Sequence, residues 1–151
     1  MTTPAILLAE DEPDSVTLFE FALRKASLAC ELQVARNGAE ALEYLEGTGR
    51  FSDRRTYPWP SLVLLDLKMP LATGFEVLDR VRQREAWRGL VVIVFTASAS
   101  PADIRAAYRL GANAYVVKPS TLEELIGLVK AIGGFWLGYN RTTGEGAGSG
   151  G

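Results

Sequence analysis

Histidine is absent from this sequence of 151 residues, and cysteine occurs once, as Cys30. Without an imidazole the chain has no histidine general base, no Ser–His or Cys–His nucleophile pair and no histidine-ligated metal. A single thiol excludes an internal disulfide and a thiolate zinc cluster, and we interpret Cys30 as a small hydrophobic side chain. The chemistry that remains is that of carboxylates, hydroxyls, lysines and hard cations.

A large net charge and long apolar runs are missing as well. Sixteen basic and 18 acidic residues give a net charge of −2, which provides no electrostatic footprint for nucleic acid. No apolar run approaches the ~18 residues of a membrane span, and the N-terminal apolar stretch is too short for a secretory signal. The length corresponds to about one domain. We therefore expect a cytoplasmic domain with no nucleic-acid or membrane partner.

Five short segments have the character of β-strands. Three of them are continuous apolar runs, as expected for strands that are buried on both faces. Another alternates polar and apolar residues, as a strand near the edge of a sheet does. The five segments cover residues 5–9, 31–35, 61–65, 90–95 and 114–117.

Between these segments the apolar residues recur every three or four positions, which predicts amphipathic helices. The predicted helices cover residues 13–28, 39–46, 73–85, 101–110 and 122–132. Ser100 followed by proline predicts the start of the fourth helix, and a capping box at 120–123 predicts the start of the fifth. The paired glycines at 133–134 should weaken the end of that last helix.

Two segments lack a periodic pattern. Residues 47–60 are rich in glycine, arginine, aspartate and proline, which predicts a long loop with an extra helical turn. Within it we interpret Arg54 and Arg55 as a solvated pair. Residues 138–151 are rich in glycine and poor in apolar side chains, so we expect a flexible C-terminal tail.

Strands that alternate with helices predict a parallel sheet with right-handed crossovers and helices on both faces. In such a doubly wound α/β fold, functional groups gather beyond the carboxyl ends of the strands. The residues at these strand ends are Glu10, Asp11, Asp66, Thr96 and Lys118. Carboxylates that are this close repel one another unless a cation joins them, and Mg²⁺ with oxygen ligands suits the site. A hydroxyl, a lysine and Mg²⁺ around one carboxylate form a socket for a phosphoryl group.

Four motifs in this order match a known family. They are Ile-Leu-Leu-Ala-Glu-Asp-Glu at 6–12, Leu-Val-Leu-Leu-Asp-Leu-Lys-Met-Pro at 62–70 with Gly74, Val-Phe-Thr-Ala at 94–97, and Gly-Ala-Asn-Ala-Tyr-Val-Val-Lys-Pro at 111–119. Over residues 4–137 the chain resembles the receiver domain of two-component response regulators. The resemblance implies a flavodoxin-like, five-stranded parallel sheet of order 2-1-3-4-5 with five helices.

The resemblance also implies roles for the strand-end residues. Asp66 corresponds to the phosphoacceptor, which takes a phosphoryl group from a sensor histidine kinase. Glu10, Asp11 and Asp66 would hold Mg²⁺ together with the backbone carbonyl of Lys68. The protein would then be a phosphoprotein of a phosphorelay and not an enzyme that turns over a substrate.

Three further residues take roles from the same resemblance. Thr96 and Lys118 would contact the phosphoryl group. Thr96 and Tyr115 would form the switch that responds to phosphorylation. The Lys118–Pro119 peptide bond would be cis, a state that few X-Pro bonds adopt.

The end of the last helix, residues 129–137, resembles stand-alone regulators that pair with phytochrome-type kinases. Such regulators form homodimers through the fourth helix, fifth strand and fifth helix, and output would come from a change in this binding face. We expect the interface to include four apolar residues, Ile132, Phe135, Trp136 and Tyr139.

Three other functions are weighed against this one. A phosphatase of the haloacid-dehalogenase type would need a second aspartate two residues after Asp66, where this chain has Lys68. A flavodoxin-like cofactor protein would need a Ser/Thr/Gly-rich phosphate loop after the first strand, where this chain is acidic. An adaptor that keeps the fold without using phosphate would not need the full set of strand-end residues.

Overall fold

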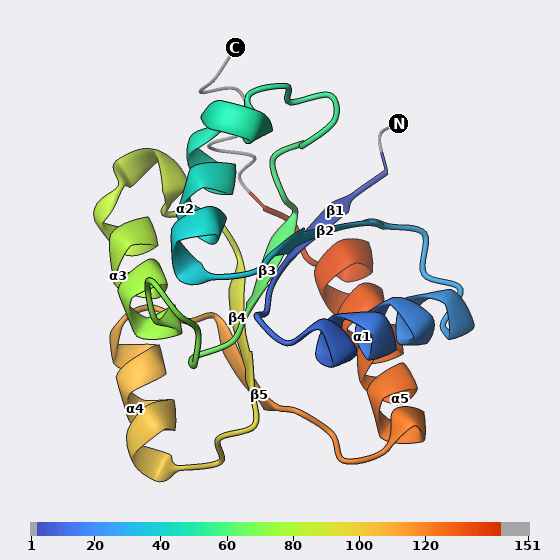
Figure 1. Ribbon diagram of the computed structural model, residues 1–151. Coiled ribbons are helices and arrows are strands. Elements are labelled where there is room, and N and C mark those ends of the chain that lie inside the picture. The colour runs from blue at the N-terminus through green and yellow to red at the C-terminus, as the bar shows by residue number, and fades with distance from the viewer. Residues whose placement is uncertain (1–2, 143–151) are drawn as a thin grey trace.

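The computed structural model describes residues 3–142 and shows a central parallel sheet with helices around it (Figure 1). Within these residues the strands are β1 (Ala5–Ala9), β2 (Glu31–Ala35), β3 (Leu62–Leu65), β4 (Val92–Thr96) and β5 (Ala114–Val117). The α-helices are α1 (Pro13–Lys25), α2 (Gly38–Glu46), α3 (Gly74–Gln83), α4 (Pro101–Arg109) and α5 (Leu122–Ile132). There are also 3₁₀ turns at Gly49–Phe51 and Glu85–Trp87 and a π-helical segment at Gly133–Tyr139.

The strands are all parallel to their neighbours and follow the order β2-β1-β3-β4-β5, which confirms the predicted flavodoxin-like topology. In this register Ala9 lies opposite Leu65. The next residues along the two strands, Glu10 and Asp66, therefore leave the sheet at neighbouring points of its carboxyl edge. The strand pairing by itself thus begins to assemble the site.

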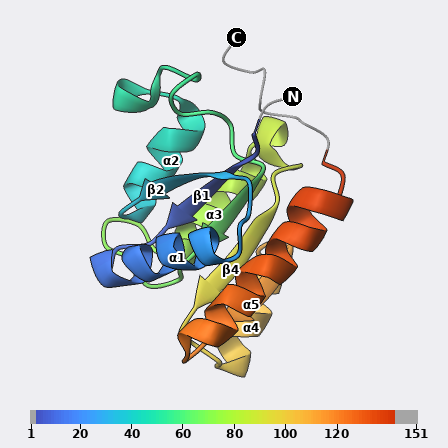
Figure 2. The same ribbon diagram turned by 90° about the vertical axis from the view of Figure 1, so that its right-hand side faces the viewer.

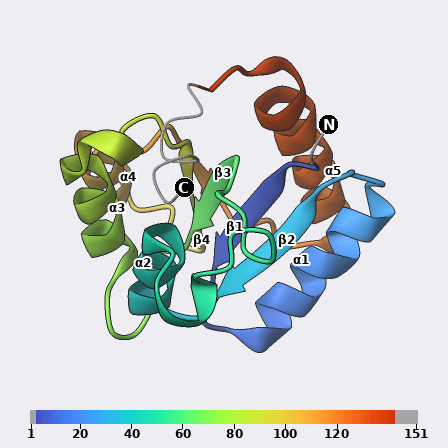
Figure 3. The ribbon, with the colours of Figure 1, turned by 90° about the horizontal axis from the view of Figure 1, so that it is seen from above.

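Helices cover both faces of the sheet. α1 and α5 pack on one face, and α2, α3 and α4 pack on the other (Figures 2 and 3). β1, β3 and β4 are buried at every position because both of their faces are covered, which explains their continuous apolar sequences. In β2, at the sheet edge, only Ala35 is buried. None of the helices in residues 3–142 is both long enough and apolar enough to cross a membrane.

The capping box of α5 lies one residue later than predicted. Thr121, and not Ser120, is the N-cap, and its hydroxyl accepts a hydrogen bond from the Glu124 amide at 3.2 Å. The sequence Ser-Thr-Leu-Glu-Glu offers two pairs at the required spacing of three residues, and the extended backbone of Thr121 decides between them. Helix boundaries of this kind depend on backbone conformation that the pattern alone leaves open.

The paired glycines do not end the last helix. At Gly133 the α-helix changes into the π-helical segment, which continues to Tyr139. A Cβ at Gly133 would lie 2.2 Å from the Leu28 side chain, so a larger residue here would require Leu28 to shift. The predicted flexible tail, 138–151, therefore starts inside a helical segment, and its last part, 143–151, is outside the described residues.

The segment 47–60 is held against the end of α2 by Arg54. We predicted that Arg54 is solvated, and this prediction is wrong. Its guanidinium donates hydrogen bonds to the carbonyl oxygens of Tyr44 (2.7 Å), Leu45 (2.6 Å) and Tyr57 (3.1 Å). Two of these carbonyls, those of Tyr44 and Leu45, belong to the last turn of α2, where a helix runs out of its own amide donors. Arg55, in contrast, has a side chain that is 97% exposed, as expected of a solvated residue.

Gly74, the first residue of α3, permits a close backbone contact beneath the site. Its amide donates to the Leu67 carbonyl at 3.0 Å, and a Cβ at this position would lie 2.2 Å from the Asp66 carbonyl oxygen. The atoms that a side chain would meet are backbone atoms, which cannot move aside without shifting the strand end. Gly74 therefore fixes how near α3 approaches Asp66.

We predict that Gly74→Ala lowers the free energy of unfolding by about 1–3 kcal/mol, the usual effect of overpacking a close contact. Urea denaturation followed by circular dichroism measures the change. Gly127→Ala is the matched control because a Cβ at Gly127, in α5, meets no atom within 4 Å. The control should gain up to about 1 kcal/mol from helix propensity. Equal effects of the two substitutions would contradict the close approach at Gly74.

Candidate functional site

Polar side chains converge at the carboxyl edge of the sheet. Glu10 and Asp11 follow β1, Asp66 follows β3, Thr96 ends β4 and Lys118 follows β5. The strands are parallel, so these ends meet at one edge although the residues are far apart in sequence. The structure thus brings together all five residues that the sequence analysis selected at strand ends.

Three carboxylates form a compact cluster there. One oxygen each of Glu10, Asp11 and Asp66 lies within 4.8 Å of the other two. Glu10 is 2% exposed and Asp66 is 7% exposed, whereas Asp11 faces solvent. Burial makes ionised carboxylates costly, so this cluster needs positive charge nearby.

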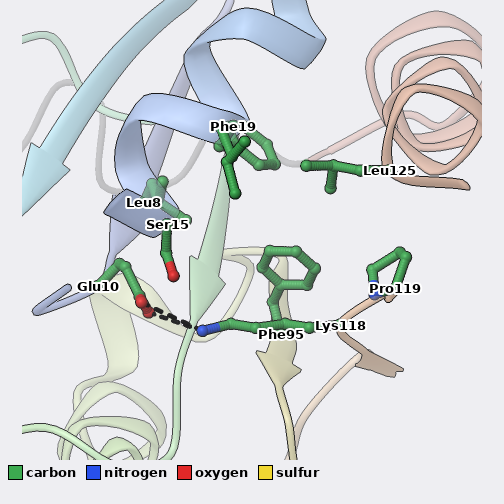
Figure 4. Close-up of a pocket in the computed structure, with 9 residues that line it drawn as sticks. Leu8, Glu10, Ser15, Phe19, Phe95, Lys118, Pro119 and Leu125 are labelled. Atoms are coloured by element: carbon green, nitrogen blue, oxygen red, sulfur yellow. Dashed lines mark hydrogen bonds and ion pairs between the residues drawn. The ribbon is translucent and has the colours of Figure 1, made fainter. Parts of the chain in front are cut away.

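Lys118 provides one positive charge inside the cluster. Its ammonium donates to both carboxylate oxygens of Glu10 at 3.1 Å (Figure 4). It also donates to Asp66 Oδ2 at 2.8 Å. The Lys118 side chain is 20% exposed, so these charge-assisted bonds are only weakly screened by water. One ammonium thus joins two of the three acids, and Asp11 stays outside this pair of contacts.

Apolar side chains border the Glu10–Lys118 pair on the side of α1 and α5. A hollow of about 90 Å³ lies there (Figure 4), and Glu10 and Lys118 reach across it. Its apolar lining consists of Leu8, Leu18, Phe19, Phe95, Pro119 and Leu125. This environment is the physical reason that a charge on Glu10 is unfavourable.

The electrostatics of the three partners differ accordingly. Burial, together with the neighbouring Asp66, raises the pKa of Glu10 from 4.5 to about 7. Burial also acts to raise the pKa of Asp66, but the interactions with Glu10 and Lys118 outweigh it and lower this pKa below its usual value. Burial disfavours the charged form of Lys118, yet its bonds to Asp66 and Glu10 raise its pKa above the ordinary value. Of the two carboxylates that Lys118 contacts, Asp66 is therefore the one whose ionised form is favoured.

The cluster fits a hard divalent cation. It offers three carboxylate oxygens in mutual reach, and the chemistry of Mg²⁺ favours oxygen ligands of this kind. A single ammonium cannot neutralise three acids, so the cluster has room for further positive charge. A cation at this point would favour the ionised form of all three carboxylates.

Asp66 lines a hollow of about 480 Å³ at this edge of the sheet. Residues from the carboxyl ends of four strands, β1, β3, β4 and β5, line it: Asp11, Glu12, Ser15, Asp66, Lys68, Thr96, Ala97, Ser98 and Lys118. The Lys68 amide donates to Asp66 Oδ1 at 3.3 Å, which orients the carboxylate. Thr96 and Lys118 line the same hollow as Asp66, so a group bound to this carboxylate would meet both side chains.

Tyr115 is half-buried on β5, and its hydroxyl donates to the Ser98 carbonyl oxygen at 2.9 Å. It therefore contacts the connection between β4 and α4, two residues beyond Thr96. Ser98 was missed in the sequence analysis, which selected Ser100 as the helix cap; Ser100 is the N-cap residue by position, but its side chain makes no capping bond. The only signal for Ser98 in the sequence is its position, two residues after the strand-end Thr96.

The expected cis bond before Pro119 is not present. Among residues 3–142 no peptide bond is cis, so the Lys118–Pro119 bond is trans. Trans is the intrinsically favoured isomer of an X-Pro bond by about 0.5–1 kcal/mol. The contacts of Lys118 with Glu10 and Asp66 are made with this isomer.

The four predicted interface residues divide into two pairs. Ile132 is buried, and Trp136 packs against the core on the α1–α5 face. Phe135 and Tyr139, on the π-helical segment, are 52% and 83% exposed. The second pair therefore offers the larger apolar surface, because Trp136 is partly buried and Ile132 is buried.

The response regulator receiver domain family model matches residues 6–130, and the chain belongs to this family. It is 37% identical over 142 residues to the probable methanogenesis regulatory protein FilR2 of Methanothrix harundinacea, covering 92% of this chain and 87% of the relative. It is 34% identical over 132 residues to response regulator Rcp1 of Synechocystis, with 87% and 88% coverage.

Solved structures agree with this assignment. Response regulator RPA3017, from red light signaling of R. palustris, has a TM-score of 0.88 at 35% identity, covering 92% of this chain and 97% of that one. The phosphorylated cyanobacterial phytochrome response regulator RcpA has a TM-score of 0.85 at 31% identity, covering 94% and 99%. The Mn²⁺-bound form of Rcp1 has a TM-score of 0.80 at 32% identity, covering 92% and 98%. Within the family, the chain is thus related to phytochrome response regulators.

We predict that Glu10→Gln stabilises the metal-free protein at pH 8. The pKa of Glu10 is higher in the folded state, about 7 against 4.5, so the unfolded chain releases this proton first as the pH rises. The folded state therefore loses stability between pH 4.5 and 7, and the loss is constant above that range. Glutamine has no charge at either pH and removes this loss of stability. The expected gain at pH 8 is about 1–3 kcal/mol in the free energy of unfolding.

Urea denaturation in EDTA at pH 5 and pH 8 measures the gain, which should be small at pH 5. Glu12→Gln removes the same charge from the exposed neighbouring residue and should show no comparable gain. If Glu10→Gln has the same effect at both pH values, the raised pKa of Glu10 is wrong.

Proposed function

We propose that Asp66 accepts a phosphoryl group from a phosphohistidine on a partner sensor histidine kinase. The observation that carries this proposal is the contact of the Lys118 ammonium with Asp66 Oδ2 at 2.8 Å, beside two further carboxylates and an open hollow. An Asp66 oxygen attacks phosphorus, the P–N bond of the phosphohistidine breaks, and the imidazole leaves. The chain itself needs no histidine because the partner supplies the imidazole.

We assign the metal site to Glu10, Asp11, Asp66 and the backbone carbonyl of Lys68. Mg²⁺ bound there would neutralise charge on the phosphoryl oxygens and on the acids. The three carboxylates supply the hard oxygen ligands that this ion prefers. The Mn²⁺-bound form of the related Rcp1 supports a divalent cation in this family.

Lys118 and Thr96 hold the transferred group. Lys118 already contacts Asp66, so its ammonium is placed to pair with a phosphoryl oxygen on that carboxylate. Thr96 is buried at the end of β4 and lines the same hollow, from which its hydroxyl would donate to the phosphoryl group. We assign Thr96 and Tyr115 to the switch that responds to phosphorylation. Thr96 leads directly into the β4–α4 connection and the Tyr115 hydroxyl bonds to it at Ser98, which supports this assignment.

A sensor kinase of the phytochrome type is the proposed partner, and the cytoplasm is the proposed location. The similarity to RcpA and to RPA3017 supports this choice of partner. Slow hydrolysis of the aspartyl phosphate would be the only turnover, because no acid stands two residues after Asp66 to act as in a phosphatase. The complete set of strand-end residues favours a phosphoacceptor over an adaptor that no longer uses phosphate.

We predict that acetyl phosphate with Mg²⁺ adds one phosphoryl group to the protein. Asp66→Asn should abolish the gain because an amide is not a competent nucleophile. Intact-mass spectrometry before and after the incubation measures it. Asp14→Asn, an exposed carboxylate in the first turn of α1, is the matched control and should gain one phosphoryl group as the natural chain does. A gain that persists in Asp66→Asn would overturn the assignment.

We also propose that output passes through a face made by α4, β5 and α5 and the segment after them. Seven large apolar side chains are prominently exposed among the described residues, and five lie on this face. The five are Tyr108, Val117, Leu122, Phe135 and Tyr139. Exposed apolar side chains that recur along adjoining elements favour an interaction surface, and a second copy of the chain is the proposed occupant.

We predict that replacing both Phe135 and Tyr139 by serine weakens self-association by about tenfold or more, since exposed aromatic anchors dominate such interfaces. Sedimentation equilibrium with and without beryllofluoride measures the dissociation constant. Leu71→Ser removes an apolar side chain that is 81% exposed outside this face and should leave association unchanged. A natural chain that stays monomeric at high concentration in both conditions would exclude the homodimer.

A further inference from the structure

The connection between β4 and α4, residues 97–100, forms one wall of the hollow above Asp66. Ala97 and Ser98 line this hollow together with Thr96. Thr96 is 1% exposed, and its carbonyl accepts a hydrogen bond of 2.7 Å from the Lys118 amide, which ties the end of β4 to β5. The wall therefore begins at Thr96, which is held by β5, and its four residues, 97–100, lead directly to α4.

The side chain of Ser98 joins this wall to α4. Its hydroxyl donates to Asp103 Oδ2 at 2.6 Å and accepts from the Ser100 amide at 3.2 Å. Asp103 lies in the first turn of α4. A hydroxyl bonded to a carboxylate makes a short, charge-assisted bond, and both residues are half-buried, which limits screening by water.

The backbone of Ser98 makes a second connection. Its carbonyl accepts the hydrogen bond from the Tyr115 hydroxyl, so one residue contacts both α4 and β5. Tyr115 also packs against the core on the α2–α4 face of the sheet. Ser98 is thus the point where the site wall, α4 and β5 meet.

We propose that Ser98, bonded to Asp103, is a positioning residue that couples the phosphoryl site to α4. The proposal rests on the proposed function. Ser98 follows Thr96 by two residues, too short a distance for the chain to absorb a shift of the wall. When Thr96 draws toward a group on Asp66, the wall moves, and the Ser98–Asp103 bond carries the first turn of α4 with it. Without this bond, a group bound at Asp66 would no longer change the position of α4.

The test compares the response of α4 to beryllofluoride with Mg²⁺, a stable mimic of the phosphoryl group. Backbone amide spectra by nuclear magnetic resonance report the site and α4 separately. In the natural chain, amides near Asp66 and amides of α4 should both shift. In Ser98→Ala the shifts near Asp66 should remain, and the α4 amides should lose most of theirs. Ser98→Thr keeps the hydroxyl and should restore the α4 response.

Ser100→Ala is the matched control, because it removes a serine hydroxyl from the same loop that makes no capping bond. It should respond as the natural chain does. Asp103→Asn tests the other end of the bond by a second route, and it should also reduce the α4 shifts. The double variant Ser98→Ala, Asp103→Asn should lose no more than either single one.

The outcomes separate this inference from the proposed function. If the natural chain shows no shift near Asp66 with beryllofluoride, the proposed function fails. If the natural chain responds and α4 in both single variants shifts as far as it does in the natural chain, the coupling through Ser98 is overturned. Loss of the shifts near Asp66 in Ser98→Ala would also overturn it, since a positioning residue acts on α4 and leaves binding intact.

Discussion

The ion pair of Lys118 with Glu10 and Asp66 is the interaction on which the site depends. Two nearly buried carboxylates stand at adjacent strand ends, and burial alone would drive both toward the neutral form. The ammonium, within 3.1 Å of each, keeps Asp66 ionised while Glu10 retains a pKa of about 7. A carboxylate whose ionised form is favoured thus lies inside the protein, at the edge of an open hollow.

At Glu10 the stability of the fold and the proposed function make conflicting demands. Glu10 costs the metal-free fold stability above pH 7 because its charge is buried against apolar side chains. The same carboxylate is one of the ligands that we propose for Mg²⁺, and a bound cation would remove the penalty. Gly74 shows a related compromise, since a helix brought against the Asp66 backbone leaves no room for a side chain.

Signal transfer depends on how the site connects to the rest of the domain. The hollow above Asp66 shares a wall with the β4–α4 connection, and Ser98 bonds that wall to α4 through Asp103 and to β5 through Tyr115. The exposed apolar side chains Tyr108 and Val117 lie on these same two elements. A change at a buried carboxylate could therefore alter a binding surface without any long-range rearrangement of the core.

The sequence alone determined the alternation of strands and helices and the placement of Glu10, Asp66 and Lys118 at strand ends, because apolar period and chain order are local properties. The topology rule then brought these residues to one edge. Tertiary structure alone decided that Arg54 is bonded to the end of α2 and that Ser98 pairs with Asp103. Each of these outcomes depends on which side chains meet after the chain has folded, and no local period encodes such contacts.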